Sequence, residues 1–168
     1  NKVFLACSGG LKSWTIGDAD LTDISTTSGT CTALSISNDG NTIVAGVSNR
    51  TFVSNDAGNN FTNVSGNGSG QINIASGRIE YAISATKNNS GNYNIYGVLT
   101  TSANGGSNLQ GMFTSKDGGQ TWSKFIGSSG TPSSLDIYRN QGTYNSIVSV
   151  NPTDNESILV GGIDVWKW

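Results

Sequence analysis

The feature that most constrains the fold is a short unit of two apolar runs and a polar turn that recurs along the chain. In its first copy, residues 32–37 alternate apolar and polar side chains, residues 38–41 form the turn, and residues 42–47 are the second run. The same unit returns at 80–98 and 145–162. This pattern is typical of a β-hairpin. Three copies predict a repeat protein in which each sheet buries a face on the next.

A third short run follows each of these hairpins. It covers residues 51–54, 111–115 and 164–167. Near the N-terminus, residues 3–7 and 11–14 match the second and third runs of the same scheme. The apolar residues come in short clusters of this kind and show no helical stripe, so the sequence predicts strands and no helix.

A sharp motif, Ser-Lys-Asp-Gly-Gly-Gln-Thr-Trp, follows the third run at residues 115–122, and a weaker copy occupies residues 54–61. Ser115 and Asp117 can exchange hydrogen bonds with the turn backbone, and the two adjacent glycines can adopt a positive φ. Trp122 then begins the next strand as a large apolar anchor. The motif is therefore predicted to be a loop that is held together by its own hydrogen bonds.

This motif resembles the Asp box, also called the BNR repeat, of β-propeller proteins. The copy at 115–122 matches every specified position, and the copy at 54–61 departs once, with Asn60 in place of Thr. The resemblance implies that the box joins the third and fourth strands of a blade, away from the ligand face, so that its role is structural. The residues assigned to the two boxes are Ser115, Asp117, Gly119, Thr121 and Trp122, and Ser54, Asp56, Gly58 and Phe61.

The fold class expected from the repeats and the resemblance is all-β, a β-propeller of four-stranded antiparallel blades with Asp-box hairpins. The expected blades are a partial one at 1–28, two full ones at 30–70 and 74–130, and a partial one at 143–168. Because a propeller closes with about four to eight blades, we expect the remaining blades to come from a longer chain, or else from another copy. Residues 141–168 resemble a blade transition in the sortilin-like propellers of large secreted proteins of Bacteroidetes-type bacteria, and xyloglucanase-like propellers also carry Asp boxes.

Composition removes several classes of function. The 168 residues include nine Lys or Arg, eleven Asp or Glu and no His, with a net charge of −2. This balance argues against nucleic acid as a partner, and no apolar run is long enough to span a membrane. Without histidine, the chain cannot assemble a Ser-His-Asp triad or a His-based zinc site. Cys7 and Cys31 could form one disulfide or lie as two small buried side chains on neighbouring strands.

Two kinds of glycoside hydrolase, the sialidases and the xyloglucanase-like enzymes, have Asp-box propellers. Sialidases bind a carboxylate with three arginines, and the chain has three, Arg50, Arg78 and Arg139, but it lacks the arginine motif and the Tyr-Glu pair of that family. Xyloglucanase-like hydrolysis needs two facing carboxylates. The spare acids outside the boxes and turns are Glu80, Asp136, Glu156 and Asp164. Asp136 is the acid to test first, and the alternative is that it is a capping or surface residue.

Two further segments could bind a ligand. Asp18, Asp20 and Asp23 gather hard oxygen ligands of the kind that Ca²⁺ prefers, without the spacing of an EF-hand. The loops at 100–110 and 128–144 could carry recognition, because loops on a rigid scaffold often do. Tyr138, Arg139 and Tyr144 in the second loop could stack on a sugar or anchor a protein, or could equally pack beneath the loop.

The function that these features favour is a non-catalytic recognition or adhesion module, which binds a glycan or an extracellular protein and belongs to a larger secreted or cell-surface bacterial protein. One alternative is part of a glycoside hydrolase propeller, either xyloglucanase-like or sialidase-like. Another is a purely structural spacer. No cofactor is expected apart from the calcium considered above.

Overall fold

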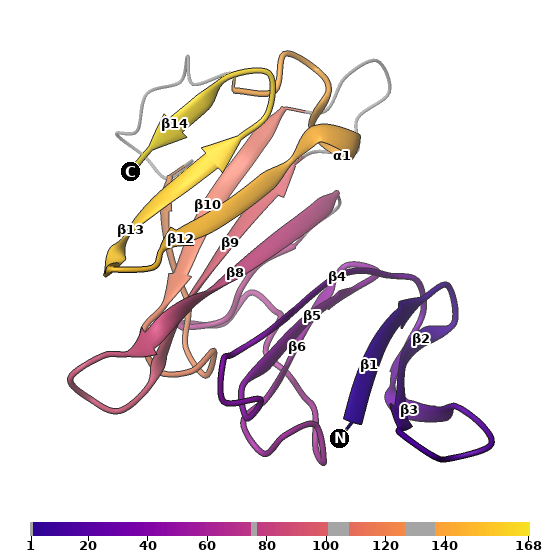
Figure 1. The fold of residues 1–168 in the computed structure, drawn as a ribbon. Coiled ribbons are helices and arrows are strands. Elements are labelled where there is room, and N and C mark those ends of the chain that lie inside the picture. Colours follow the sequence, from indigo (N-terminus) through magenta and orange to yellow (C-terminus); the bar gives the residue numbers. More distant parts are fainter. Residues whose placement is uncertain (1, 75–76, 101–107, 127–136) are drawn as a thin grey trace.

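The computed structural model describes residues 2–74, 77–100, 108–126 and 137–168, and in these residues the chain is almost entirely β-structure. The described strands form four antiparallel sheets, each built from strands that are consecutive in sequence and lie next to one another (Figure 1). The all-β class and the antiparallel sheets of up to four strands are therefore confirmed.

We number the sheets in chain order. Sheet 1 contains β1 (Lys2–Cys7), β2 (Gly10–Thr15) and β3 (Thr22–Ser28). Sheet 2 contains β4 (Cys31–Ile36), β5 (Ile43–Val47), β6 (Arg50–Ser54) and β7 (Thr62–Asn63). Sheet 3 contains β8 (Arg78–Lys87), β9 (Tyr93–Thr100), β10 (Leu109–Ser115) and β11 (Ser123–Ile126). Sheet 4 contains β12 (Ile147–Asn151), β13 (Asp154–Gly161) and β14 (Val165–Lys167).

One short helix, α1 (Gly142–Asn145), precedes sheet 4, although the sequence predicted none. It is a single turn, closed by the amide of Asn145 donating to the carbonyl of Gln141 at 3.3 Å. Helical periodicity cannot reveal an element of four residues, because one turn is too short to form an apolar stripe.

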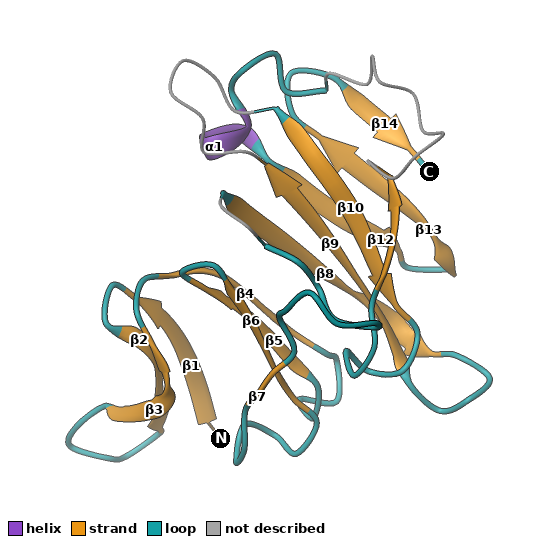
Figure 2. Ribbon diagram, turned by 180° about the vertical axis from the view of Figure 1, so that it is seen from behind, coloured by secondary structure: helices purple, strands orange, loops and turns teal. Residues whose placement is uncertain are grey.

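Successive sheets pack face to face, and one apolar cluster fills each interface (Figure 2). Between sheets 1 and 2 lie Leu11, Ile43, Ala45, Phe52 and Phe61. The interface of sheets 2 and 3 holds Val44, Val53, Ile79, Tyr81, Ile95 and Trp122, and that of sheets 3 and 4 holds Tyr96, Val98, Met112, Val148 and Val160. Burial of each large side chain contributes about 1.5–3 kcal/mol, so the stack depends on these three interfaces.

The residues that the sequence pattern placed in hairpin turns form Asx turns. Asp39 accepts from the amide of Asn41, and Asn88 accepts from the amide of Ser90, each at 3.0 Å. Asn151 accepts from the amide of Thr153 at 3.0 Å in the corresponding turn of sheet 4. A side-chain oxygen thus closes the first hairpin of sheets 2, 3 and 4 in the same way.

Both cysteine thiols are free in the structure. Cys31 is buried at the start of β4, and Cys7 is half-buried at the end of β1. Burial raises the pKa of the Cys31 thiol above its ordinary value, so the neutral form of the side chain is favoured.

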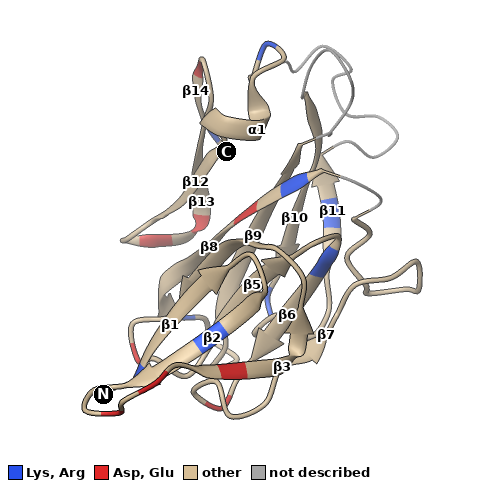
Figure 3. Cartoon of the chain, turned by 90° about the vertical axis from the view of Figure 1, so that its right-hand side faces the viewer, with Lys and Arg blue, Asp and Glu red and all other residues tan. Residues whose placement is uncertain are grey.

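Charged residues are sparse, and both signs are scattered over the sheets and loops (Figure 3). None of the helices in the described residues is long and apolar enough to cross a membrane.

Candidate functional sites

The loop at 115–122, which we call box 2, joins β10 to β11 and is closed by hydrogen bonds to two side chains. Ser115 Oγ donates to Asp117 Oδ1 at 2.7 Å and accepts from the amide of Gly119 at 2.8 Å. Asp117 also accepts from the amide of Thr121 at 2.9 Å and from its hydroxyl at 2.5 Å. Both carboxylate oxygens of Asp117 are therefore engaged inside the loop.

The loop at 54–61, box 1, joins β6 to β7 and forms the same bonds despite its altered sequence. Ser54 Oγ donates to Asp56 at 2.7 Å and accepts from the amide of Gly58 at 2.9 Å. Asn60 donates to Asp56 twice, from its backbone amide at 2.9 Å and from its side-chain amide at 2.7 Å. The Asn60 amide thus replaces the threonine hydroxyl that the motif specifies.

These bonds favour the charged form of both carboxylates. Hydrogen bonds from Asn60 and Ser54 lower the pKa of Asp56 to about 2. Burial of the Asp117 carboxylate alone would raise its pKa, but hydrogen bonds from Thr121 and Ser115 outweigh that effect, and the pKa lies below its ordinary value. Such carboxylates are poor proton donors, so neither is suited to general acid catalysis.

The glycine at the fifth position of each box, Gly58 or Gly119, is the point where the preceding sheet packs. Gly119 has a φ of +89°, and a Cβ built there would lie 2.8 Å from Val53 Cγ2. Gly58 has a φ of +77°, and its Cβ would lie 2.2 Å from Phe4 Cζ. Glycine is required at both positions by conformation and by space, and each box therefore forms part of an interface between sheets.

The aromatic residue that ends each box is buried in the interface with the preceding sheet. Trp122 packs on Tyr81 with ring centroids 6.1 Å apart, and its indole nitrogen donates to the carbonyl of Gly119 at 2.9 Å. Phe61 packs edge-on against Phe4 of sheet 1 at 6.4 Å. These contacts anchor the loops to the core rather than presenting the rings to a ligand.

The variable residue between Ser and Asp of each box reaches the following sheet. In box 1, Asn55 donates to the carbonyl of Gly118 in box 2 at 3.0 Å. In box 2, Lys116 pairs with Glu156 of sheet 4 at 2.5 Å. Sequence reasoning did not identify this role, because the two partners lie 63 and 40 residues away in sequence.

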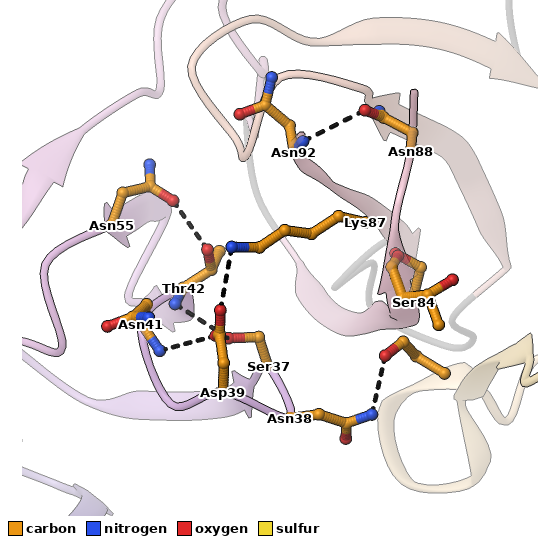
Figure 4. Close-up of polar contacts among 12 residues, drawn as sticks. Ser37, Asn38, Asp39, Asn41, Thr42, Asn55, Ser84, Lys87, Asn88 and Asn92 are labelled. Carbon is orange, nitrogen blue, oxygen red and sulfur yellow. Dashed lines mark hydrogen bonds and ion pairs between the residues drawn. The ribbon is translucent and has the colours of Figure 1, made fainter. Parts of the chain in front are cut away.

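The turns at the same end of the stack form further polar bridges between sheets 2 and 3 (Figure 4). Lys87 of β8 pairs with Asp39 at 3.1 Å, and Asn38 donates to the carbonyl of Ala85 at 2.8 Å. Thr42 donates to Asn55 at 2.9 Å, which connects the turn to box 1. A hydrogen bond from Ser37 is the largest of several effects that lower the pKa of Asp39. Turns and boxes together hold neighbouring sheets in register.

A groove of about 530 Å³ lies beside the two boxes, lined in part by Val53, Asn60, Val64 and Gln120. Its polar groups already bond to the loops: Asn60 donates to Asp56, and Gln120 donates to the carbonyl of Asp117 at 3.1 Å. The groove is therefore a product of the packing of the boxes, and its side chains serve the loops.

A different surface surrounds α1, and we call it the α1 surface: Arg78, Glu80, Arg139, Tyr144 and Asp164. Tyr144 has 69% of its area exposed. Arg78 donates to the carbonyl of Thr143, the residue before Tyr144, at 2.7 Å and pairs with Glu80 at 2.6 Å. Arg139 pairs with Asp164 at 3.0 Å. Burial raises the pKa of Glu80 above its ordinary value. The surface thus combines an exposed ring with two arginine–carboxylate pairs.

The three residues proposed for binding in the second loop do not share one environment. Tyr138 is fully buried in the interface of sheets 3 and 4, and its hydroxyl shares a hydrogen bond of 2.9 Å with Ser146. Burial raises its pKa to about 12. Its ring supports the loop from below and is not available to a ligand, whereas Arg139 and Tyr144 are exposed. Most of the loops at 100–110 and 128–144 lies outside the described residues.

Among the described residues, those considered for hydrolysis are not gathered into a catalytic group. Arg50 donates to the carbonyl of Ser28 at 2.6 Å, and Arg78 and Arg139 pair with separate acids. Among the acids, Glu80 pairs with Arg78 on the same strand, β8. Glu156 pairs with Lys116 of box 2, and Asp164 pairs with Arg139. Asp136 lies outside the described residues, as does any contact it makes.

The acidic segment near β3 is exposed and its side chains differ in their roles. Asp23 pairs with Lys12 at 2.5 Å across β2 and β3. The carbonyl of Asp18 accepts from the indole of Trp14 at 3.0 Å, and Asp20 is exposed. In the described part of the chain, no three His, Cys, Asp or Glu residues are grouped so that they could hold a metal ion.

Comparison with known proteins gives a distant structural likeness. No family model matches the sequence, and no curated protein matches it. The chain is similar in structure to an ancestral GH74 enzyme of known crystal structure, with 13% sequence identity and a TM-score of 0.46. The match covers 99% of this chain and 29% of that enzyme, so the chain spans less than a third of the enzyme's length.

Proposed function

We propose that the chain is a non-catalytic recognition module of a secreted or cell-surface protein, and that the α1 surface binds a glycan or an extracellular protein. The observation that carries the proposal is the exposed ring of Tyr144 on α1, where Arg78 of one arginine–carboxylate pair donates to the carbonyl of the neighbouring Thr143. An exposed aromatic face can stack on a sugar or anchor a protein, and fixed charge pairs can orient polar groups.

The ion pairs and lowered pKa values of acids in the described part of the chain support binding rather than hydrolysis. Hydrolysis of a glycoside needs one carboxyl group that donates a proton and a second that faces it across the substrate. Glu80, Glu156 and Asp164 are each paired with a cation, and the carboxylates of the two boxes are held ionised by their loops.

We also propose that the module works within a larger stack, in which a further antiparallel sheet of the same kind packs on the outer face of sheet 4. On that face, Ile147 and Val165 are 62% and 73% exposed, and Leu159 is also exposed. The opposite face, with Val148 and Val160, is buried on sheet 3. Apolar area of this kind is typical of an interface, and the packing of sheets 1 to 4 on one another supports a further sheet as the partner. We expect the chain to sediment as a monomer at micromolar concentration; self-association would instead assign this face to a second copy.

Binding to immobilised glycans and to extracellular matrix proteins tests the recognition role, with Tyr144→Ala as the variant and Ile16→Ala as the control. Both side chains are exposed, at 69% and 60%. Ile16 lies just after the end of β2 in the sheet 1 region, not on the α1 surface. We expect Tyr144→Ala to weaken binding by about tenfold or more, as for a central aromatic contact, and Ile16→Ala to leave it unchanged.

Two outcomes would overturn this proposal. Equal binding by the two variants would show that the α1 surface is not the site. Release of reducing sugar from a bound glycan by the purified chain would show that the protein is a hydrolase, which is the main alternative.

A further inference from the structure

The strand β1 occupies a different place in its sheet from the other three strands that begin a sheet. Its residues Leu5-Ala-Cys-Ser-Gly-Gly10 align with Ala45-Gly-Val-Ser-Asn-Arg50, the tight turn between the second and third strands of sheet 2. By this alignment, β1 corresponds to β5 and β2 corresponds to β6. Sheet 1 therefore begins at the second strand of the repeat.

The packing of the sheets supports the same assignment. β5 lies against β8, and β9 lies against β12, so a second strand contacts the first strand of the following sheet. β1 lies against β4 in the same manner. The first strands also contact one another in order, β4 with β8 and β8 with β12. In this row of first strands, the neighbour of β4 on the side of sheet 1 is not among the described residues.

Burial differs where that neighbour would lie. Every residue of β5 and β9 is buried between two paired strands, whereas β1 pairs only with β2 and none of its described side chains is buried. On β4, Ile36 is 49% exposed and Leu34 is half-buried. On β8, Ile79 and Tyr81 of the matching face are buried in the interface with sheet 2.

The edge of β1 also lacks the features that normally prevent strand pairing. Natural edge strands are protected by charges, proline or bulges. β1 reads Lys-Val-Phe-Leu-Ala-Cys, with its one charge at the first position, and it pairs with β2 in an unbroken register. Phe4 meanwhile packs on sheet 2 against Phe61, which fixes the position of the strand.

We propose that the free edge of β1 accepts an antiparallel β-strand supplied from outside residues 1–168, whose inner side chains cover Leu34 and Ile36 of β4. The strand that fits has the chemistry of β4 itself, in which apolar and small polar residues alternate. Backbone pairing supplies the affinity of such an added strand, and alternate side chains supply its specificity. This site is separate from the α1 surface and does not depend on the recognition role.

The test adds the missing strand to the chain. A copy of residues 32–40, Thr-Ala-Leu-Ser-Ile-Ser-Asn-Asp-Gly, placed before Asn1 recreates the hairpin that joins β4 to β5, because Asn1-Lys2 aligns with Asn41-Thr42. A control extension of equal length carries Ala33→Pro, Leu34→Pro and Ser35→Pro within the copy, so that it cannot pair. We expect the first extension to slow amide hydrogen exchange by roughly tenfold or more at those residues from Val3 to Ala6 whose amides point to the free edge of β1, and the control to leave it unchanged.

A peptide of the copied sequence added to the unextended chain gives a second measurement if the extended chain does not fold. We expect the peptide to slow exchange of the same β1 amides, and a peptide with the three prolines to have no effect. Unchanged exchange with both the folded extension and the peptide would overturn the proposal. So would protection of β1 in a dimer of the unextended chain, because the occupant would then be a second copy.

Discussion

Box 1 and box 2 share only the first Ser, the Asp two residues later and the Gly at the fifth position, yet they form the same loop. Asn60 and Thr121 both donate twice to the aspartate, and Asn59 and Gln120 both donate to its carbonyl, at 2.7 and 3.1 Å. Different side chains supply equivalent donors at two positions. The loop therefore needs one serine hydroxyl, one carboxylate and one glycine, and the two positions before the aromatic residue need only a donor of suitable reach.

The two boxes differ in the side chains that pack against their fifth-position glycine. Each glycine lies against one fully buried isoleucine, Ile95 at Gly119 and Ile43 at Gly58. The second neighbour differs: Gly119 meets the buried Val53, whereas Gly58 meets the partly buried ring of Phe4 in sheet 1. Box 2 also has its tryptophan tied to Gly119 by a hydrogen bond. Box 2 is therefore set in a more closed environment, and changes there should cost more than changes in box 1.

The largest loss in free energy of unfolding, and the largest difference between the boxes, is expected for the glycine at the fifth position. Gly119→Ala adds a methyl group at a φ of +89° in contact with buried side chains, and we expect it to lower the free energy of unfolding by about 2–4 kcal/mol. Gly58→Ala should cost about 1 kcal/mol less, because the Phe4 ring can turn aside. Urea unfolding of both variants checks the order. Equal losses would show that the two environments do not differ.

Removal of the carboxylate from box 2 should have the next largest effect. Asp117→Ala leaves the Ser115 hydroxyl and two donors of Thr121 without their acceptor, at a cost of about 2–3 kcal/mol. Asp117→Asn retains one acceptor oxygen and serves as the matched control, with a smaller loss. Urea unfolding at neutral pH measures both. A loss as small as that of an average surface substitution, under about 0.5 kcal/mol, would contradict the role given to this residue.

Acid should lower the stability that both boxes contribute to the fold. The pKa of Asp56 is about 2 in the folded chain, and that of Asp117 is also lowered. A group with a lowered folded pKa contributes stability that is present above its unfolded pKa, near 3.9, and is lost as the pH falls through the folded value. We therefore expect the free energy of unfolding to fall between about pH 4 and pH 2, and to fall less steeply in Asp117→Ala. Parallel acid profiles for the variant and the parent chain would argue against the box as a source of this loss.

Much of this fold follows from local patterns. Alternating runs and turn residues such as Asp39, Asn88 and Asn151 predict hairpins, because a strand and an Asx turn are each encoded within a few residues. The equivalence of Asn60 to threonine did not follow, since it depends on the reach of the amide in the folded loop. The burial of Tyr138, the bridge from Asn55 to Gly118 and the pairing of Arg78 with the loop at α1 depend on contacts between distant segments, which no local pattern encodes.

The hydrogen-bond geometry, and not the identity of the residues, determines whether the segment forms a box. Exchanging the two donors, with Asn60→Thr in box 1 and Thr121→Asn in box 2, tests this claim most directly, because both side chains are exposed and each new one has a donor that can reach the same carboxylate. We predict that urea unfolding at neutral pH will give each single variant a free energy of unfolding within about 0.5 kcal/mol of the parent chain. A loss of about 2 kcal/mol or more in either variant, comparable to a broken charged hydrogen bond, would contradict the claim.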